Sequence, residues 1–223
     1  MRRIGIILIL ILNSLPAQEP AFKVGFDIDD TVLYSEAIFV QPRAKQNGNL
    51  DFAWINQQDR KFSVPITPTL DLIHYFEARK IPVYFITGRH PENGNDLADY
   101  LTGVLGFPVK MNENLFFSHE AMIYGKTIQG KATIMQTLGI SVYYGDADSD
   151  ILDALAAHVQ PVRIVRYSAS VDQYSRNYFG DTQAKRNPET PWDSLDLSIF
   201  LKSHVGPFGE PIYPIIWEGP EGN

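Results

Sequence analysis

The chain has 223 residues, with 26 Asp and Glu against 19 Lys and Arg, a formal charge of -7, and no cysteine. This length accommodates one domain with a substantial core, and 44% hydrophobic with 20% charged residues excludes a disordered or fibrous chain. The excess of acid argues against binding to a nucleic-acid polymer, and the lack of cysteine excludes disulfides, cysteine-based zinc sites and thiol catalysis.

The amino terminus has the pattern of a secretory signal peptide. Two Arg residues precede an apolar run from Ile4 to Leu12, and Ala17 is a small residue at a suitable cleavage point. The run is shorter than the roughly 20 residues that a spanning helix needs, so a membrane anchor is the weaker alternative and a buried strand is another. We therefore expect residues 1–17 to be removed, which leaves residues 18–223 as a mature protein outside the cytoplasm and without a membrane segment.

Short apolar runs rich in β-branched and aromatic residues recur along the mature chain and predict strands buried on both faces. These runs are Phe22–Phe26, Pro82–Ile86, Ser141–Tyr144 and Pro161–Val165. Helical patterns lie between them: one begins at Thr67-Pro68 with Thr67 as N-cap, one covers Lys131–Leu138, and one begins at Ser149 and extends toward Val159. Strands that alternate with helices predict an α/β fold, a three-layer doubly wound parallel sheet that binds ligands at the carboxyl ends of its strands.

Two segments depart from this alternation. Residues 34–66, rich in Gln, Asn and aromatics, follow the first strand and predict a small inserted cap. Residues 171–203 predict a long excursion near the carboxyl terminus. The apolar tail from Pro211 to Asn223 is expected to pack on its own or a neighbouring subunit.

The sharpest motif is Asp27-Ile28-Asp29-Asp30-Thr31 at the end of the first predicted strand. Two carboxylates two residues apart can face one cavity, where one attacks phosphorus and the other gives and takes the proton of the leaving group. An acidic turn is the ordinary alternative for such a run.

Two further clusters supply groups that suit a phosphate. Thr87, Gly88 and Arg89 follow the second strand and offer a hydroxyl, backbone amides and a cation that can contact the substrate. Lys131 begins a predicted helix, where a cation can neutralise the phosphate and the nucleophile together. The alternatives are a frequent Thr-Gly turn and a solvated lysine, with Lys126 as a nearby competitor.

The third predicted strand ends in Gly145-Asp146-Ala147-Asp148-Ser149-Asp150. Mg²⁺ keeps several waters and takes one or two carboxylates, so Asp27, Asp146 and the carbonyl of Asp29, supported by Asp150, suit one ion. A calcium-binding EF-hand loop is excluded because it needs Gly at its sixth position and Glu at its twelfth, where Ile151 and Ala157 stand.

In this order, the four motifs resemble the haloacid dehalogenase (HAD) superfamily of phosphohydrolases, and more closely its class B bacterial acid phosphatases, secreted phosphatases of the DDDD group. The quoted segments are FDIDDTVLYS, FITGR, Lys131 and YYGDADSDI, together with VRIVRYSAS. The likeness covers approximately residues 26–170.

The resemblance implies a role for each matching residue. Asp27 is the expected nucleophile and Asp29 the general acid and then base, while Thr87, Gly88, Arg89 and Lys131 hold the phosphate. It also implies Phe39 and Trp54 as cap residues around the leaving group, and one Mg²⁺ per subunit held by Asp27, Asp29 through its main chain, Asp146 and Asp150. A periplasmic homotetramer that hydrolyses nucleotides and other phosphomonoesters is the expected protein.

Two alternatives remain open on the same residues. A phosphotransferase or a narrower phosphatase fits the same scaffold, because an aspartyl-phosphate can pass to an alcohol as well as to water. A phosphate- or metal-binding envelope protein without catalysis is the alternative from another class.

Overall fold

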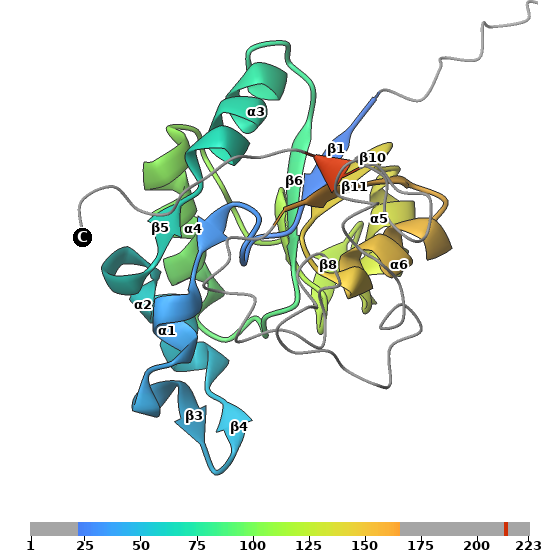
Figure 1. Cartoon of the computed structure of the whole chain (residues 1–223). Coiled ribbons are helices and arrows are strands. Elements are labelled where there is room, and N and C mark those ends of the chain that lie inside the picture. Colours follow the sequence, from blue (N-terminus) through green and yellow to red (C-terminus); the bar gives the residue numbers. More distant parts are fainter. Residues whose placement is uncertain (1–21, 166–211, 214–223) are drawn as a thin grey trace, which may run out of the picture.

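The computed structural model describes residues 22–165 and 212–213, and its centre is a parallel sheet of six strands (Figure 1). In order across the sheet, the strands are β12 (Ile212–Tyr213), β11 (Gln160–Ile164), β10 (Val142–Gly145), β1 (Val24–Phe26), β6 (Val83–Thr87) and β7 (Leu115–Phe117). All four predicted strands are present, which confirms the predicted parallel α/β sheet. The sequence did not predict the two short edge strands, β7 and β12.

Helices cover both faces of this sheet because successive strand residues point to opposite sides. Phe85 packs with one hydrophobic cluster, which includes α3 and α4, whereas its neighbour Ile86 packs with a second cluster, which includes α5 and α6. Figure 1 shows α3 and α4 separated by the sheet from α5 and α6. These helices are α3 (Thr67–Glu77), α4 (Gly94–Leu105), α5 (Lys131–Leu138) and α6 (Asp148–Ala156). The fold is therefore the expected three-layer arrangement.

Two of the predicted helix boundaries shift. Thr67 is the first residue of α3 and Ile66 is its N-cap, because the amides of Thr69 and Leu70 already donate to the Ile66 carbonyl at 3.0 and 3.1 Å. Likewise α6 begins one residue before the predicted Ser149. Val159 is buried but lies beyond the end of α6.

The segment predicted as a cap, residues 34–66, forms a small structure of its own. It is joined to the sheet by β2 (Leu33–Tyr34) and β5 (Val64–Pro65), which pair antiparallel. Between them lie α1 (Glu36–Phe39), η1 (Pro42–Ala44), β3 (Lys45–Gln46), β4 (Asn49–Leu50) and α2 (Phe52–Phe62). Residues of α1, η1 and α2 share a hydrophobic cluster apart from the sheet, whereas β3 and β4 form an exposed hairpin. A second hairpin, β8 (Ala121–Ile123) with β9 (Lys126–Ile128), precedes α5.

Several predictions concern parts of the chain outside the described residues. These are the signal peptide at 1–17, the excursion at 171–203 and the tail, of which only Ile212–Tyr213 is described, as the strand beside β11. Among residues 22–165 and 212–213, no helix combines the length and the apolar character needed to cross a membrane.

Candidate active site

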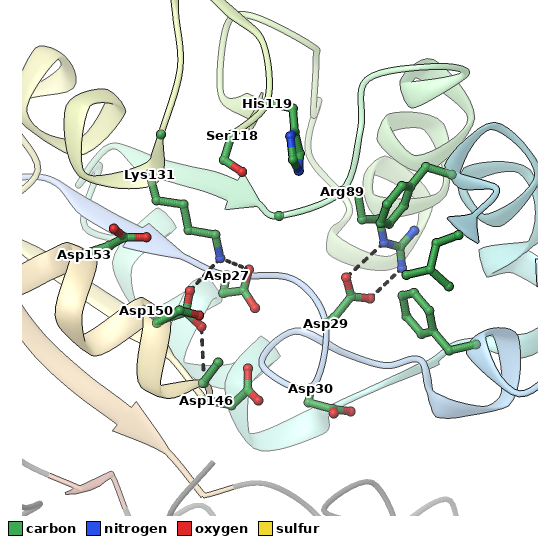
Figure 2. A pocket seen from close by; sticks show the side chains of 17 residues that line it. Asp27, Asp29, Asp30, Arg89, Ser118, His119, Lys131, Asp146, Asp150 and Asp153 are labelled. Carbon is green, nitrogen blue, oxygen red and sulfur yellow. Dashed lines mark hydrogen bonds and ion pairs between the residues drawn. The ribbon is translucent and has the colours of Figure 1, made fainter. Parts of the chain in front are cut away.

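The predicted motifs meet at one cavity of about 480 Å³, at the carboxyl ends of β1, β6 and β10 (Figure 2). Residues from each predicted motif line it, including Asp27, Gly88, Lys131 and Asp146. The meeting follows from the topology: β1 lies between β6 and β10, and all three strands run in the same direction. The sheet therefore brings together residues that are more than 100 positions apart in the sequence.

The loop after β1 turns back on itself around one carbonyl group. The Ile28 carbonyl accepts from the amides of Thr31, Val32 and Leu33 at 3.3, 2.9 and 2.9 Å. Asp30 has a φ of 56°, a left-handed conformation that Asp adopts more readily than most residues. This tight turn is why both Asp27 and Asp29 line the same cavity, as their spacing in the sequence predicts.

On one side of the cavity lies a group that we call the Lys131 cluster: Asp27, Lys131, Asp146 and Asp150. The ammonium group of Lys131 donates to Asp27 Oδ1 at 2.6 Å and to Asp150 Oδ1 at 2.5 Å (Figure 2). The carboxylates of Asp27, Asp146 and Asp150 each offer an oxygen within 4.8 Å of the others, and all three residues are buried. The cluster therefore holds one cation among three acids.

Backbone features allow these acids to lie so close together. A side chain at Gly145 would meet the Cβ of Asp150 at 2.4 Å, so only glycine fits there. The amide of Ala147 donates to Asp150 Oδ2 at 3.2 Å. Arg163 on β11 is buried, donates to the carbonyl of Asp146 at 2.9 Å and pairs with Asp148 at 3.0 Å. These contacts fix the loop between β10 and α6 around its acidic residues.

The electrostatics of the Lys131 cluster favour an additional cation. Burial raises the pKa of Asp27 well above its ordinary value, and the charge of Asp150 raises it further, despite the opposing effect of Lys131. Burial also raises the pKa of Asp150. Burial lowers the pKa of Lys131, but the adjacent Asp150 and Asp27 outweigh this effect and hold it well above its ordinary value. Three buried carboxylate oxygens are the ligand type of a hard divalent ion, so the donor set fits a metal.

On the other side lies a second group, the Arg89 cluster: Asp29, Asn56, Asp59 and Arg89. Arg89 forms a two-pronged contact with Asp29, from Nε to Oδ2 at 3.0 Å and from Nη2 to Oδ1 at 2.6 Å (Figure 2). A second two-pronged contact joins Arg89 to Asp59, at 2.6 and 3.0 Å. Burial would raise the pKa of Asp29, but the charge and hydrogen bonds of Arg89 hold it below its ordinary value, helped by Ser35.

Three of the four predicted phosphate-binding residues line the cavity, and the fourth, Thr87, does not. Gly88 and Lys131 line the cavity. Thr87 is buried, and its hydroxyl accepts from the amide of Arg89 at 3.1 Å. Arg89 also lines the cavity, but its guanidinium binds carboxylates and an amide of the protein, so its predicted contact with substrate would require one of these bonds to open.

Of the two cap aromatics that the sequence predicts at the site, one lines the cavity and the other does not. Phe39 lines the cavity as expected, and its ring lies 5.8 Å from the guanidinium carbon of Arg89. Trp54 does not line it; its ring packs against Phe62, 6.3 Å away, in the cluster inside the cap. Phe52, two residues earlier on α2, lines the cavity instead.

Phe39 and Phe52 form an aromatic wall of the cavity, and two histidines extend it. The rings of His90 and His119 stack with their centroids 3.8 Å apart, and His90 also stacks on Phe52 at 5.1 Å. His119 lines the cavity from the segment after β7. Sequence reasoning missed Phe52 and His119, because neither lies in a motif and the stack joins three separate segments.

The chain is similar in sequence to known acid phosphatases. A family model described as HAD superfamily, subfamily IIIB (acid phosphatase), matches residues 10–171. The class B acid phosphatase of Proteus mirabilis is 32% identical over 167 residues, which cover 71% of this chain and 68% of that protein. The enzyme of Morganella morganii is 33% identical over 168 residues, with the same coverage. Among solved structures, a HAD hydrolase from Entamoeba histolytica aligns with a TM-score of 0.46 and 15% identity, covering 70% of this chain and 88% of that one.

Proposed function

The chain belongs to the acid phosphatases of HAD subfamily IIIB and is a phosphomonoesterase, and from this premise we propose that it is a secreted, Mg²⁺-dependent enzyme that hydrolyses nucleotides and other organic phosphomonoesters. One observation carries the proposal: Asp27 and Asp29 line the same cavity, and each is bound by a different buried cation. This arrangement supports two different roles for two neighbouring carboxylates.

The proposed first step uses Asp27 as nucleophile. A carboxylate oxygen of Asp27 attacks phosphorus, a P–O bond to Asp27 forms, and the P–O bond to the leaving alcohol breaks. Asp29 gives its proton to the departing oxygen, because an alkoxide leaves poorly unless it is protonated. Lys131, 2.6 Å from Asp27, offsets the charge of the phosphoryl oxygens.

The proposed second step returns the enzyme to its first state. Asp29, now ionised, takes a proton from water, and the resulting hydroxide attacks phosphorus and breaks its bond to Asp27. Inorganic phosphate leaves and Asp29 is again protonated.

We propose that Asp27, Asp146 and Asp150, with the main-chain carbonyl of Asp29, hold the Mg²⁺. The ion would offset the negative charge of these carboxylates and of the phosphate oxygens. Thr87 and Gly88 are proposed to contact the phosphate, Thr87 through its hydroxyl and Gly88, which is exposed just after β6, through its backbone.

The aromatic wall supports an aryl or nucleoside leaving group. Phe39, Phe52 and His119 line the cavity, and aromatic faces favour stacking on flat rings. Phe52→Ala is therefore expected to raise KM for p-nitrophenyl phosphate and nucleotides by about tenfold, a loss typical of one stacking contact, and to affect glycerol phosphate less. Trp54→Ala is the matched control on the same helix, and an equal KM effect of both variants would contradict this assignment.

The cellular setting of the enzyme is also a proposal. The amino-terminal pattern and the bacterial sources of the class B relatives support cleavage after Ala17, a periplasmic location and a single phosphatase domain of residues 18–223 with a cap at 34–66. A homotetramer is proposed by likeness to the family. Mass spectrometry of the secreted protein and analytical ultracentrifugation test these points.

The function is tested with a panel of phosphomonoesters on the purified mature protein. We expect phosphate release from p-nitrophenyl phosphate, nucleoside monophosphates and glycerol phosphate, its loss in EDTA and its return with Mg²⁺. Release that persists in EDTA would contradict the metal requirement. Phosphate transfer to added glycerol in excess of hydrolysis would favour a phosphotransferase.

A further inference from the structure

The Arg89 cluster joins the cap to the side chain that is proposed as the acid. We propose that Asp59, on cap helix α2, is a positioning residue that orients Asp29 for proton transfer by fixing the guanidinium plane of Arg89. The inference rests on the proposed function, because it needs Asp29 to act as the general acid. Asp59 does not line the cavity and therefore acts only through Arg89.

The hydrogen bonds of Arg89 account for every donor that its side chain has. Of its five N–H donors, one at Nε and one at Nη2 bind Asp29. The second at Nη2 and one at Nη1 bind Asp59, and Nη1 also donates to Asn56 Oδ1 at 3.3 Å. Each acid is thus bound along a different edge of the same planar group. Rotation of that plane would move Asp29.

The position of Asp59 is itself fixed from within the cap. Its side chain is 1% exposed, and Oδ1 accepts from the Ser63 hydroxyl at 2.7 Å. On the same helix, Asn56 donates to the carbonyls of His90 and Glu92 at 3.0 and 2.8 Å, which joins α2 to the loop that carries Arg89. Helix α2 therefore holds both the loop and the guanidinium.

Charge gives a reason to assign Asp59 a role beyond neutralisation. Arg89 and Asp29 already form a neutral pair, so a second buried carboxylate adds a net negative charge and a desolvation cost. What Asp59 adds is a second two-pronged contact, which defines the orientation of a planar group more sharply than a single ion pair. Asp29, whose side chain remains 26% exposed to the cavity, is the end of this chain of contacts that meets substrate.

The test compares two leaving groups. p-Nitrophenolate leaves readily without a proton, whereas the alkoxide of glycerol phosphate depends on the general acid. Asp59→Asn keeps the shape but removes the charge. We expect it to lower the single-turnover rate of leaving-group release from glycerol phosphate by about 10- to 100-fold, the effect of a misplaced catalytic group, with a much smaller loss for p-nitrophenyl phosphate and little change in KM for either. This first step is measured because the second step uses Asp29 as base for both substrates. Asp99→Asn, exposed on α4, is the control and should leave both rates unchanged.

A purely structural role would lower both rates by the same factor, and that result would overturn the inference, as would equal rates in variant and parent enzyme. Asp59→Glu, which keeps the charge, should recover part of the lost rate on glycerol phosphate. If Asp59→Asn does not fold, Ser63→Ala removes one hydrogen bond from Asp59 and should give the same selective loss at smaller size.

Asp29→Asn, measured in parallel, distinguishes failure of the positioning role of Asp59 from failure of the proposed acid role of Asp29. If it shows the selective loss and neither Asp59→Asn nor Ser63→Ala does, the positioning role is wrong and the proposed function stands. If Asp29→Asn slows the release of both leaving groups equally in a single turnover, Asp29 is not the acid and both proposals fail.

Discussion

Two buried cations, Lys131 and Arg89, stand on opposite sides of the cavity (Figure 2). Each forms ion pairs with two carboxylates. In the Arg89 cluster, a five-donor side chain binds two acids and an amide, and the pKa of Asp29 lies below its ordinary value. In the Lys131 cluster, an ammonium group lies among three acids, and the pKa values of Asp27 and Asp150 lie above theirs.

The difference indicates that the Arg89 cluster has a positioning role, whereas the Lys131 cluster contains the proposed nucleophile and metal ligands. The Arg89 cluster satisfies the donors of its cation within the protein, so it is suited to fix geometry. The Lys131 cluster holds three carboxylates whose oxygens lie within 4.8 Å of one another, so it is suited to receive a metal ion. Substitutions in the two clusters should therefore have different effects.

The largest expected effect is on the nucleophile in the Lys131 cluster. Asp27→Asn keeps the size of the side chain but removes the attacking oxygen anion, so kcat for p-nitrophenyl phosphate should fall by at least about a thousandfold. Asp29→Asn, in the other cluster, should still release p-nitrophenolate in a single-turnover burst, because this leaving group needs little help from an acid, although its steady-state turnover falls because the second step uses Asp29 as base. Activity of Asp27→Asn near that of the parent enzyme would reject the assigned mechanism.

The sequence predicted the Lys131 cluster more completely than the Arg89 cluster. Asp27, Lys131 and Asp146 each follow a strand or begin a helix, so a parallel sheet is enough to bring them together. Asp59 and Asn56 lie instead in a polar stretch of α2 that resembles a solvated helix face, and only packing against the loop after β6 buries them.

The same reason explains other residues and elements that the sequence did not assign correctly. Phe52 and Trp54 are two positions apart on α2 and point in different directions, and the phase of that helix is not set by its sequence alone. Helix α4 was missed although Leu97, Leu101 and Leu105 repeat at helical spacing and are buried. The strands β7 and β12 have three and two residues, too few to show a pattern.

The second prediction concerns the metal. Asp146→Asn removes one carboxylate of the Lys131 cluster, so the Mg²⁺ concentration for half-maximal activity should rise by at least about tenfold. Asp59→Asn removes a buried carboxylate from the Arg89 cluster and should leave that concentration unchanged, whatever it does to kcat. Metal titrations of phosphate release give both values, and equal shifts in the two variants would show that the clusters are not distinct.

The third prediction compares the two cations by their effect on stability. Removing either one leaves buried carboxylates without a partner, which costs about 3 to 5 kcal/mol. We expect Mg²⁺ to restore part of the loss in Lys131→Met, because the ion supplies positive charge to the same acids. It should not restore Arg89→Met. Urea unfolding of both variants, with EDTA and with Mg²⁺, measures this, and equal rescue of the two would contradict the comparison.

The smallest effect is the pH dependence of stability in the metal-free protein. Because burial raises the pKa of Asp27 and Asp150, the folded state binds their protons more tightly than the unfolded state does. Their contribution to stability is present below the ordinary pKa of aspartate and is lost as pH rises through the raised values. The pKa of Asp29 is lowered, so its contribution is present above the ordinary value and is lost as pH falls through the lowered one. Lys131, whose pKa is raised, keeps its charge throughout this range.

In EDTA, the Tm should therefore rise by a few degrees from neutral to mildly acidic pH and fall again in stronger acid. Asp150→Asn should flatten the neutral-to-acidic part only, and a Tm that falls steadily from neutral pH downward in the parent protein would mean that the Lys131 cluster carries no excess of buried acid.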